Sequence, residues 1–174
     1  MPLTNPFLSE PMPAGRLERP ELEERILNLL SAHNMCVLAT HGPKGLIATP
    51  VRYFSLDLTL MFTANLRSPK MQNIAAEPEV SIGLHAPLVG LASSRGVQVF
   101  GKAEVIADDD PRFAGYWEAF RWESEQIEQG RSPEDSPGAV VVVHPDRMVY
   151  TEHWLRRSGF AARQIWKPEQ DQNG

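Results

Sequence analysis

The sequence predicts an α+β protein that is built on an antiparallel β-barrel. Short apolar segments with β-branched residues recur along the chain, and turns of a few residues separate several of them. Few segments carry the periodicity of a helix, and no internal repeat is visible. A chain of 174 residues is long enough for one domain with a sizeable core.

Composition and charge restrict the classes of partner. The net charge of −5 argues against a general nucleic-acid binder, which needs a basic footprint, but a local basic pocket would suit a small anionic ligand. The single cysteine, Cys36, lies in the apolar run MCVLAT and is expected to be a buried, inert thiol. No segment has the length of a membrane span, and the N-terminus has no signal core, so we expect a cytoplasmic protein.

The first half of the chain predicts an arm, a helix and a meander. Residues 1–19 are proline-rich and are expected to form a flexible arm, and an apolar stripe at helical spacing follows in residues 21–34. Strands are expected at 35–40, 46–54 and 58–64, and their short connections predict an antiparallel meander.

The middle of the chain predicts a short helix between strands. Ser68 is the expected N-cap, Pro69 fits the first helical position and Pro78 stops the helix. Two further strands are expected at 80–85 and 95–106, and a loop is expected between them at 86–94. Gly101 is the expected site of a bulge or of close packing in the second of these strands.

The C-terminal part predicts one more helix and the last strands. Residues 108–130 are expected to be helical, with an aromatic stripe that packs on the barrel or a partner subunit, or forms a ligand cage; the stripe comprises Phe113, Tyr116, Trp117 and Phe120. Residues 139–154 predict two strands that a His-Pro-Asp turn separates. A short strand or extended tail is expected at 160–168, so the single domain spans 20–168 and residues 169–174 form a frayed tail.

The segment FTANLRSPKMQNI, residues 62–74, carries the strongest functional signal. Two hydroxyls, two cations and two amides gather where a strand runs into a helix; they belong to Thr63, Ser68, Arg67, Lys70, Asn65 and Asn73. Free N–H groups at a helix start attract anions, so the segment predicts a phosphate cradle, unless its cations are solvated surface charges. A tight hairpin at SLD would place Arg52 beside Thr63 and so add a third cation.

Four ordered segments carry a resemblance to a known family: ATPVRYF, LMFTA, SPKMQNIAAEPEVSIGL and RGVQVFGKAEVI. Over residues 22–168 the chain resembles the pyridoxamine 5′-phosphate oxidase-like family of FMN-binding split barrels, and it looks most like the small, stand-alone members. The resemblance implies an antiparallel split barrel of six to eight strands in a Greek-key-like order, with a few flanking helices. It also implies a homodimer with its FMN sites at the interface.

The resemblance further implies roles for individual residues. The backbone of Thr49, Pro50 and Val51 would run along the isoalloxazine edge, and Phe62 and Thr63 would touch the ring and the ribityl or phosphate region. The phosphate would be held by Arg52, Ser68 and Lys70. Pro69 stands where the family often has an arginine, and Arg67 is the candidate replacement, although the turn is one residue longer than usual. Gln98 would either contact the flavin or only decorate its strand.

The function implied is that of an FMN-dependent oxidoreductase that acts on a small molecule or NAD(P)H, with no identified catalytic residue. The alternatives are a non-catalytic protein that binds or senses flavin or haem, a deazaflavin-dependent reductase, and a cofactor-free dimeric scaffold. The tail GFAARQIWKP lacks the oxidase's Arg-x-His pattern, so vitamin B6 synthesis is not expected, although Arg163 and Trp166 could approach a partner's flavin. Four histidines are scattered without the i, i+4 spacing of a metal site, although any of them could be the axial ligand if the chain bound haem; they are His41, His85, His144 and His153.

Overall fold

The structure is a computed structural model that describes residues 12–88, 94–119 and 138–169. Its helices are α1 (Arg19–Ser31), α2 (Pro69–Ala76), α3 (Phe113–Ala119) and the 3-10 helix η2 (His153–Ser158). Its strands are β1 (Met35–Thr40), β2 (Ile47–Arg52), β3 (Phe54–Leu56), β4 (Thr59–Phe62), β5 (Glu79–His85), β6 (Arg95–Ala107), β7 (Ala139–Glu152) and β8 (Arg163–Trp166).

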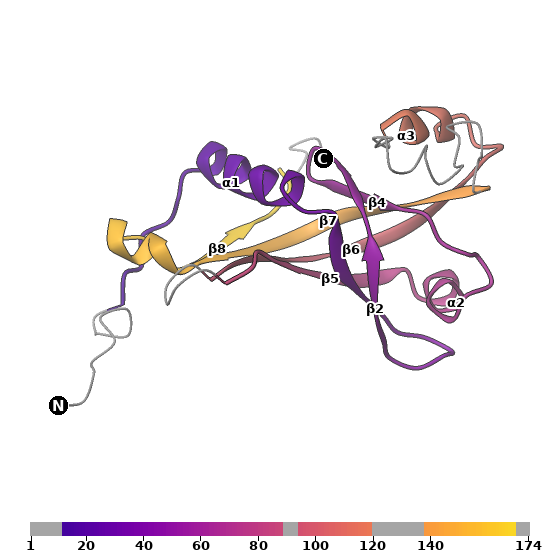
Figure 1. Cartoon of the computed structure of the whole chain (residues 1–174), viewed down its shortest axis with the longest axis horizontal. Helices are drawn as coiled ribbons and strands as arrows, with labels where there is room; N and C mark the ends of the chain where they lie inside the picture. Colours follow the sequence, from indigo (N-terminus) through magenta and orange to yellow (C-terminus); the bar gives the residue numbers. More distant parts are fainter. Residues whose placement is uncertain (1–11, 89–93, 120–137, 170–174) are drawn as a thin grey trace, which may run out of the picture.

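The strands form one curled antiparallel sheet, which confirms the predicted fold class. Its order is β2-β1-β5-β6-β7-β4-β3, with β8 added beside β7. Strands β2 and β3 lie at opposite ends of this order, yet only Tyr53 separates them in the chain. The sheet must therefore curl into a half-barrel so that its two end strands approach each other (Figure 1).

One face of the sheet and one face of α1 enclose the core. The expected apolar stripe of the helix is confirmed, since its buried residues are Leu22, Ile26, Leu29 and Leu30. Strand β5 alternates between buried and more exposed residues, as a sheet with one covered face requires. Figure 1 shows α1 over β8 and α2 toward the other end of the sheet. None of the helices in the described ranges is long and apolar enough to cross a membrane.

Tyr53 interrupts the strand that was expected over residues 46–54. Its backbone N–H donates to the Asn34 carbonyl at 2.9 Å, and its hydroxyl donates to the Leu30 carbonyl at 2.7 Å. After this anchor the chain leaves β1 and pairs with β4 instead. The expected meander is therefore wrong, because β4 lies between β3 and β7 and not beside β2.

Strand β7 is continuous, so the prediction of two strands split by a turn at residues 144–146 is wrong. The register shifts here, where Gly101 lies opposite Pro145 and Phe100 lies opposite Arg147. Asp146 is the extra residue of a bulge, which accommodates a proline that cannot donate to the ladder. The close packing predicted at Gly101 is confirmed, because a Cβ there would collide with the His144 carbonyl, whereas the extra residue of the bulge lies on β7. The strand ends at Glu152, and η2 begins where more strand was expected.

The packed unit reaches back beyond the expected boundary at residue 20. Gly15 forms a parallel bridge with Phe160, and the Leu17 N–H donates to the buried Gln164 side chain at 3.1 Å. The side-chain Nε2 of Gln164 donates in turn to the Gly15 carbonyl at 3.2 Å. Residues 15–19 are thus in contact with the C-terminal strand, whereas 1–11 and 170–174 lie outside the described residues.

The expected helix over 108–130 is described only in part. Helix α3 begins at Phe113, and the segment from Phe120 onward lies outside the described residues. The rings of Phe113 and Trp117 stack at 5.9 Å, and Tyr116 packs beside them on a small cluster with Met61 and residues of β6 and β7. The described part of the aromatic stripe therefore packs on the sheet.

Asn73 ties α2 to the β1–β2 hairpin. Its side chain is fully buried, and its Oδ1 accepts the Lys44 N–H at 2.8 Å. Its Nδ2 donates to the Gly45 carbonyl at 2.8 Å and to the Thr40 hydroxyl at 3.3 Å. One amide of α2 thus satisfies polar groups of a hairpin that lies 28 to 33 residues earlier in the sequence.

We expect Asn73→Ala to lower the free energy of unfolding by about 1–3 kcal/mol, because it leaves buried polar groups without a partner. Urea denaturation followed by circular dichroism measures this loss. Glu77→Ala, an exposed change at the end of the same helix, should stay within about 0.5 kcal/mol of the parent. Equal stability of the two variants would contradict the role given to Asn73.

Burial raises the pKa of the Cys36 thiol to about 12. At pH 8 only about one thiol in ten thousand is then ionised, and the thiolate is the reactive form. We expect iodoacetamide to leave Cys36 unmodified in the folded protein and to alkylate it fully in 8 M urea, as followed by mass spectrometry. Rapid alkylation of the folded protein at pH 8 would contradict this.

Candidate functional site

The start of α2 is a candidate anion site. Ser68 is the N-cap, as predicted, with φ −68° and ψ 153°, but its side chain makes no capping hydrogen bond. The buried Ser68 Oγ has no hydrogen-bond partner within the described part of the chain. A buried hydroxyl without a partner is costly, so this atom is suited to a ligand that accepts its proton.

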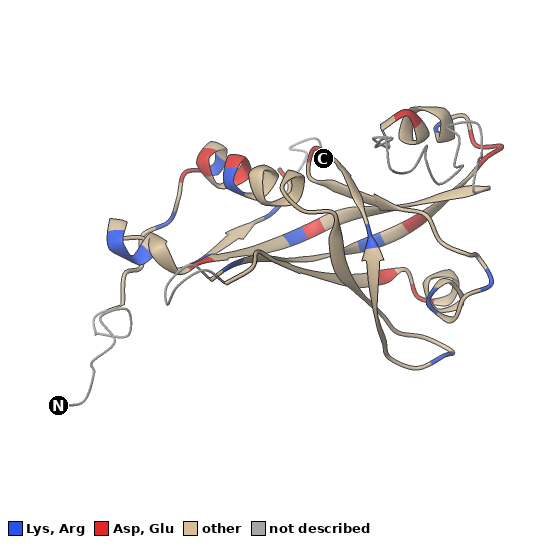
Figure 2. Cartoon of the chain, in the orientation of Figure 1, with Lys and Arg blue, Asp and Glu red and all other residues tan. Residues whose placement is uncertain are grey.

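Two cations flank this hydroxyl in the sequence. Lys70 is half-buried in the first turn of α2, and Arg67 is exposed in the turn before it. Figure 2 shows blue, cationic positions in α2 and in the segment that leads into it. Asn65 shapes this turn, since its Oδ1 accepts the Arg67 N–H at 2.9 Å. The dipole of the helix adds a partial positive charge at the same end. Together these groups can bind a phosphate, but the amide of Asn73 is engaged in the hairpin contact and does not contribute.

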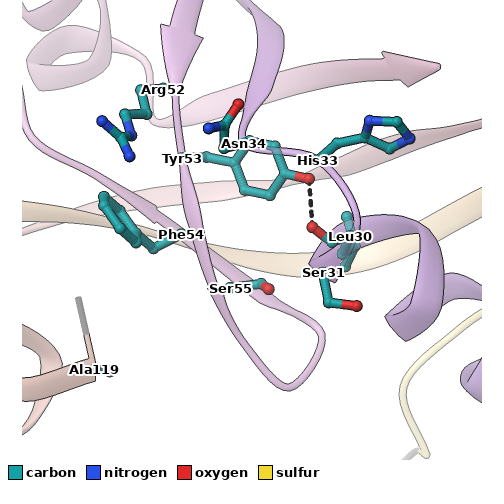
Figure 3. A pocket seen from close by; sticks show the side chains of 9 residues that line it. All are labelled: Leu30, Ser31, His33, Asn34, Arg52, Tyr53, Phe54, Ser55 and Ala119. Carbon is teal, nitrogen blue, oxygen red and sulfur yellow. Dashed lines mark hydrogen bonds between the residues drawn. The ribbon is translucent and has the colours of Figure 1, made fainter. Parts of the chain in front are cut away.

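Arg52 lies at the junction of β2 and β3. Its guanidinium carbon is 5.6 Å from the centre of the Phe54 ring. It lines a cavity of about 120 Å³ together with His33, Asn34 and Ser55 (Figure 3). The β3–β4 pairing extends only to Phe54 opposite Met61, so Arg52 is outside the hairpin that was expected to set it beside Thr63.

The other residues expected near a flavin differ in what they can offer. The side chains of Val51 and Phe62 point into the core, with 8% and 0% of their surfaces exposed, so only their backbones remain for a ligand. Pro50 and Thr63 are exposed, and Thr49 is half-buried. Trp166 is withdrawn from solvent under α1, because its Nε1 donates to Glu23 Oε1 at 2.6 Å.

The outer face of the sheet carries a row of residues that includes Gln98. Strand register places Gln98 between Gly83 of β5 and Val149 of β7, and continues the row through Val37 and Ile165. Val37 and Ile165 are 44% and 49% exposed, so the row presents apolar surface on this face. This face is hollowed by cavities of about 290 and 360 Å³ that share Val37 and Gly83.

The structure also places two histidines at these cavities; sequence reasoning named His85 only as one of four candidate haem ligands and missed His33. His85 lines both cavities on the outer face, and His33 lines the smaller of them as well as the cavity at Arg52. The alternation of β5 places His85 on the same face as Gly83, and this signal was available in the sequence. His33 lies in the connection between α1 and β1, and no periodicity marked it.

Three solved structures show how widely this fold is shared. General Stress Protein 26 from Bacillus anthracis str. Sterne is 19% identical over 85% of this chain and 99% of that chain, with a TM-score of 0.64. A FAD-binding protein from Mesorhizobium loti is 18% identical over 76% and 90%, with a TM-score of 0.58. A heme binding protein from Mycobacterium smegmatis is 20% identical over 87% and 60%, with a TM-score of 0.65.

No curated protein matches the sequence. The family model for pyridoxamine 5′-phosphate oxidase matches residues 22–152, which includes the start of α2, the outer row up to β7 and both histidines of the cavities. The match extends over well more than half of the chain, and the half-barrel is the fold of the solved structures. The chain therefore belongs to the pyridoxamine 5′-phosphate oxidase family.

Proposed function

We propose that the chain is an FMN-binding flavoprotein that acts as an oxidoreductase on a small molecule or NAD(P)H. The observation that carries this proposal is the buried Ser68 hydroxyl, which has no partner within the described residues and stands at the start of a helix beside Lys70. A terminal phosphate fits this donor set, because it accepts several hydrogen bonds and carries negative charge.

The chain would hold one FMN molecule by its phosphate and by its ring. Ser68, Lys70 and Arg67 would bind the phosphate, and Arg52 would add charge from the end of β2. The backbone of Thr49–Val51 would follow the ring edge, and Gln98 would face the ring from the outer row. When bound, FMN supplies the two-electron redox chemistry, and the protein supplies orientation and electrostatics.

The family context supports a bound cofactor without deciding which one. One structural neighbour is described as FAD-binding and another as heme binding. Haem is the second candidate, because His85 offers an imidazole on the hollowed outer face. An absorption spectrum of the purified protein separates the two, since flavin bands support the proposal and a Soret band favours haem.

We further propose that a second copy of this chain covers the outer face. An exposed face with Met35, Val37 and Ile165 is more apolar than a solvated sheet surface needs to be. The cofactor would then lie at the interface, because the outer row and its cavities occupy the same face.

Ser68→Ala and Lys70→Ala should each weaken FMN binding by about 1.5–3 kcal/mol, the range for hydrogen bonds to a charged group. Fluorescence titration with FMN measures the affinity. Ser68→Ala should not lower the free energy of unfolding, because it removes a buried hydroxyl that caps nothing. Lys44→Ala, which removes an exposed cation from the β1–β2 turn, is the matched control. Unchanged FMN affinity in both site variants would refute the phosphate site.

Val37→Glu should convert the dimer to a monomer, because it places a charge in the centre of the proposed interface. Sedimentation velocity measures the oligomeric state, and FMN retention should fall together with dimerisation. Leu46→Glu is the control, since Leu46 is 84% exposed in the β1–β2 turn and lies outside the outer row. A parent protein that sediments as a monomer would exclude the interface.

A further inference from the structure

A second row on the outer face joins a histidine to an arginine. In register, His85 of β5 lies opposite Gly96 of β6, Gly96 opposite Thr151 of β7, and Thr151 opposite Arg163 of β8. These four residues therefore cross the sheet in a line. On each strand, the residue of this line is two positions away from the residue of the row that contains Gln98. Neighbouring strands are about 4.8 Å apart, so the Cα atoms at the two ends are separated by about 14 Å.

Gly96 keeps the middle of this row open. It has no side chain, and an added Cβ would lie 2.8 Å from the Leu84 carbonyl, so a larger residue does not fit without movement. The four residues line one cavity of about 360 Å³, which also includes Gln98. The row thus lines a hollow, with His85 at one end, Arg163 at the other and Thr151 between them.

The His85 ring has one defined tautomer when it is neutral. Its Nδ1 lies 3.1 Å from the Ala86 carbonyl oxygen. A carbonyl can only accept, so Nδ1 carries the hydrogen and the lone pair is on Nε2. Within the described residues this is the one hydrogen bond that the ring makes, so Nε2 is available to exchange a proton with a ligand.

The other end of the row is suited to a carboxylate. Arg163 is exposed, and none of the described carboxylates forms a salt bridge with it. The side chain of Arg95 lines the same cavity, and His33 and Cys36 line the adjoining one with His85. These are the titratable and charged groups that the structure places around the hollow, and none of them is a carboxylate. A guanidinium and a hydroxyl together bind a carboxylate well.

We propose that this row binds a small 2-hydroxy acid as the substrate of the flavin site, with Arg163 and Thr151 on its carboxylate and His85 on its hydroxyl. The inference rests on the proposed function, because it needs oxidised FMN as the two-electron acceptor. The C–H bond at C2 breaks, and the hydrogen leaves with both electrons as a hydride to the flavin. The hydroxyl proton passes to His85 Nε2, and a carbon–oxygen double bond forms, so the product is a 2-oxo acid.

Binding is tested first, with oxalate as an unreactive dicarboxylate probe of the FMN-loaded protein. Oxalate should shift the NMR signals of the His85 ring and of the Gly96 and Thr151 amides in a saturable way. Arg163→Met should weaken this binding about ten- to a hundredfold, which matches the loss of one charge-assisted pair. Lys167→Met removes an exposed cation just after β8 and should leave it unchanged. Shifts elsewhere, or equal affinity in the two variants, would overturn the carboxylate site.

The proton role is tested by anaerobic reduction of bound FMN with glycolate and L-lactate in a stopped-flow spectrometer. His85→Asn keeps a donor close to the Ala86 carbonyl but has no base, so it should bind FMN normally and reduce it about a hundredfold or more slowly. His41→Asn, in the β1–β2 turn, should react as the parent does. Equal rates in both variants, or no reduction by either acid, would overturn the proposal.

Loss of the substrate site and loss of the flavin site would give different results. If FMN is retained but oxalate does not shift the row, this inference is wrong and the flavin site stands. If FMN is not retained, the proposed function is wrong and the catalytic step falls with it. The oxalate titration can then be made on the cofactor-free protein, where shifts confined to the row would still support an anion site and their absence would exclude it.

Discussion

The anchoring of Tyr53 determines how the sheet closes. Its hydroxyl is hydrogen-bonded to the end of α1, its N–H is hydrogen-bonded to the residue before β1, and the residue is buried with 2% of its surface exposed. One residue later the chain belongs to the opposite end strand of the sheet. A buried tyrosine with both polar groups satisfied is held firmly in place. The half-barrel therefore has a fixed seam, and Arg52 and Phe54 are positioned on its two sides.

The curl gives the two faces of the sheet different tasks. The inner face and α1 hold the apolar residues of the core. Polar contacts at the margin bind the helix to the sheet: Arg25 forms a salt bridge with Glu152 at 2.9 Å, and Trp166 Nε1 donates to Glu23 Oε1 at 2.6 Å. The outer face is free of the core and carries rows of side chains from six strands. Because a register fixes which residues lie opposite each other, the rows are as rigid as the sheet itself. This rigidity is what a site for a planar ring and a small substrate requires.

Local signals in the sequence located most elements and the part of the candidate site at the start of α2. Ser68 and Pro69 marked the start of α2 because capping and proline rules act within a single turn. The apolar stripe of α1 and the close packing at Gly101 were also local signals. The interruption at Tyr53 was not readable, because its cause is a hydrogen bond to a helix 23 residues away in the chain. The continuity of β7 across Pro145 was hidden for a similar reason, since a glycine on β6 makes room for it.

The sequence alone determined the family, the barrel class and the cluster of hydroxyl and cations before α2, because these depend on residue types at short spacing. Only the tertiary structure decided that β4 pairs with β7, that Arg52 lies by Phe54, and that Trp166 is turned inward under α1. It also brought His85 and Arg163, 78 positions apart, to the ends of one row. The physical reason is that strand order and register arise from long-range pairing, in which every hydrogen bond needs one group from each of two distant segments. No single segment contains that information.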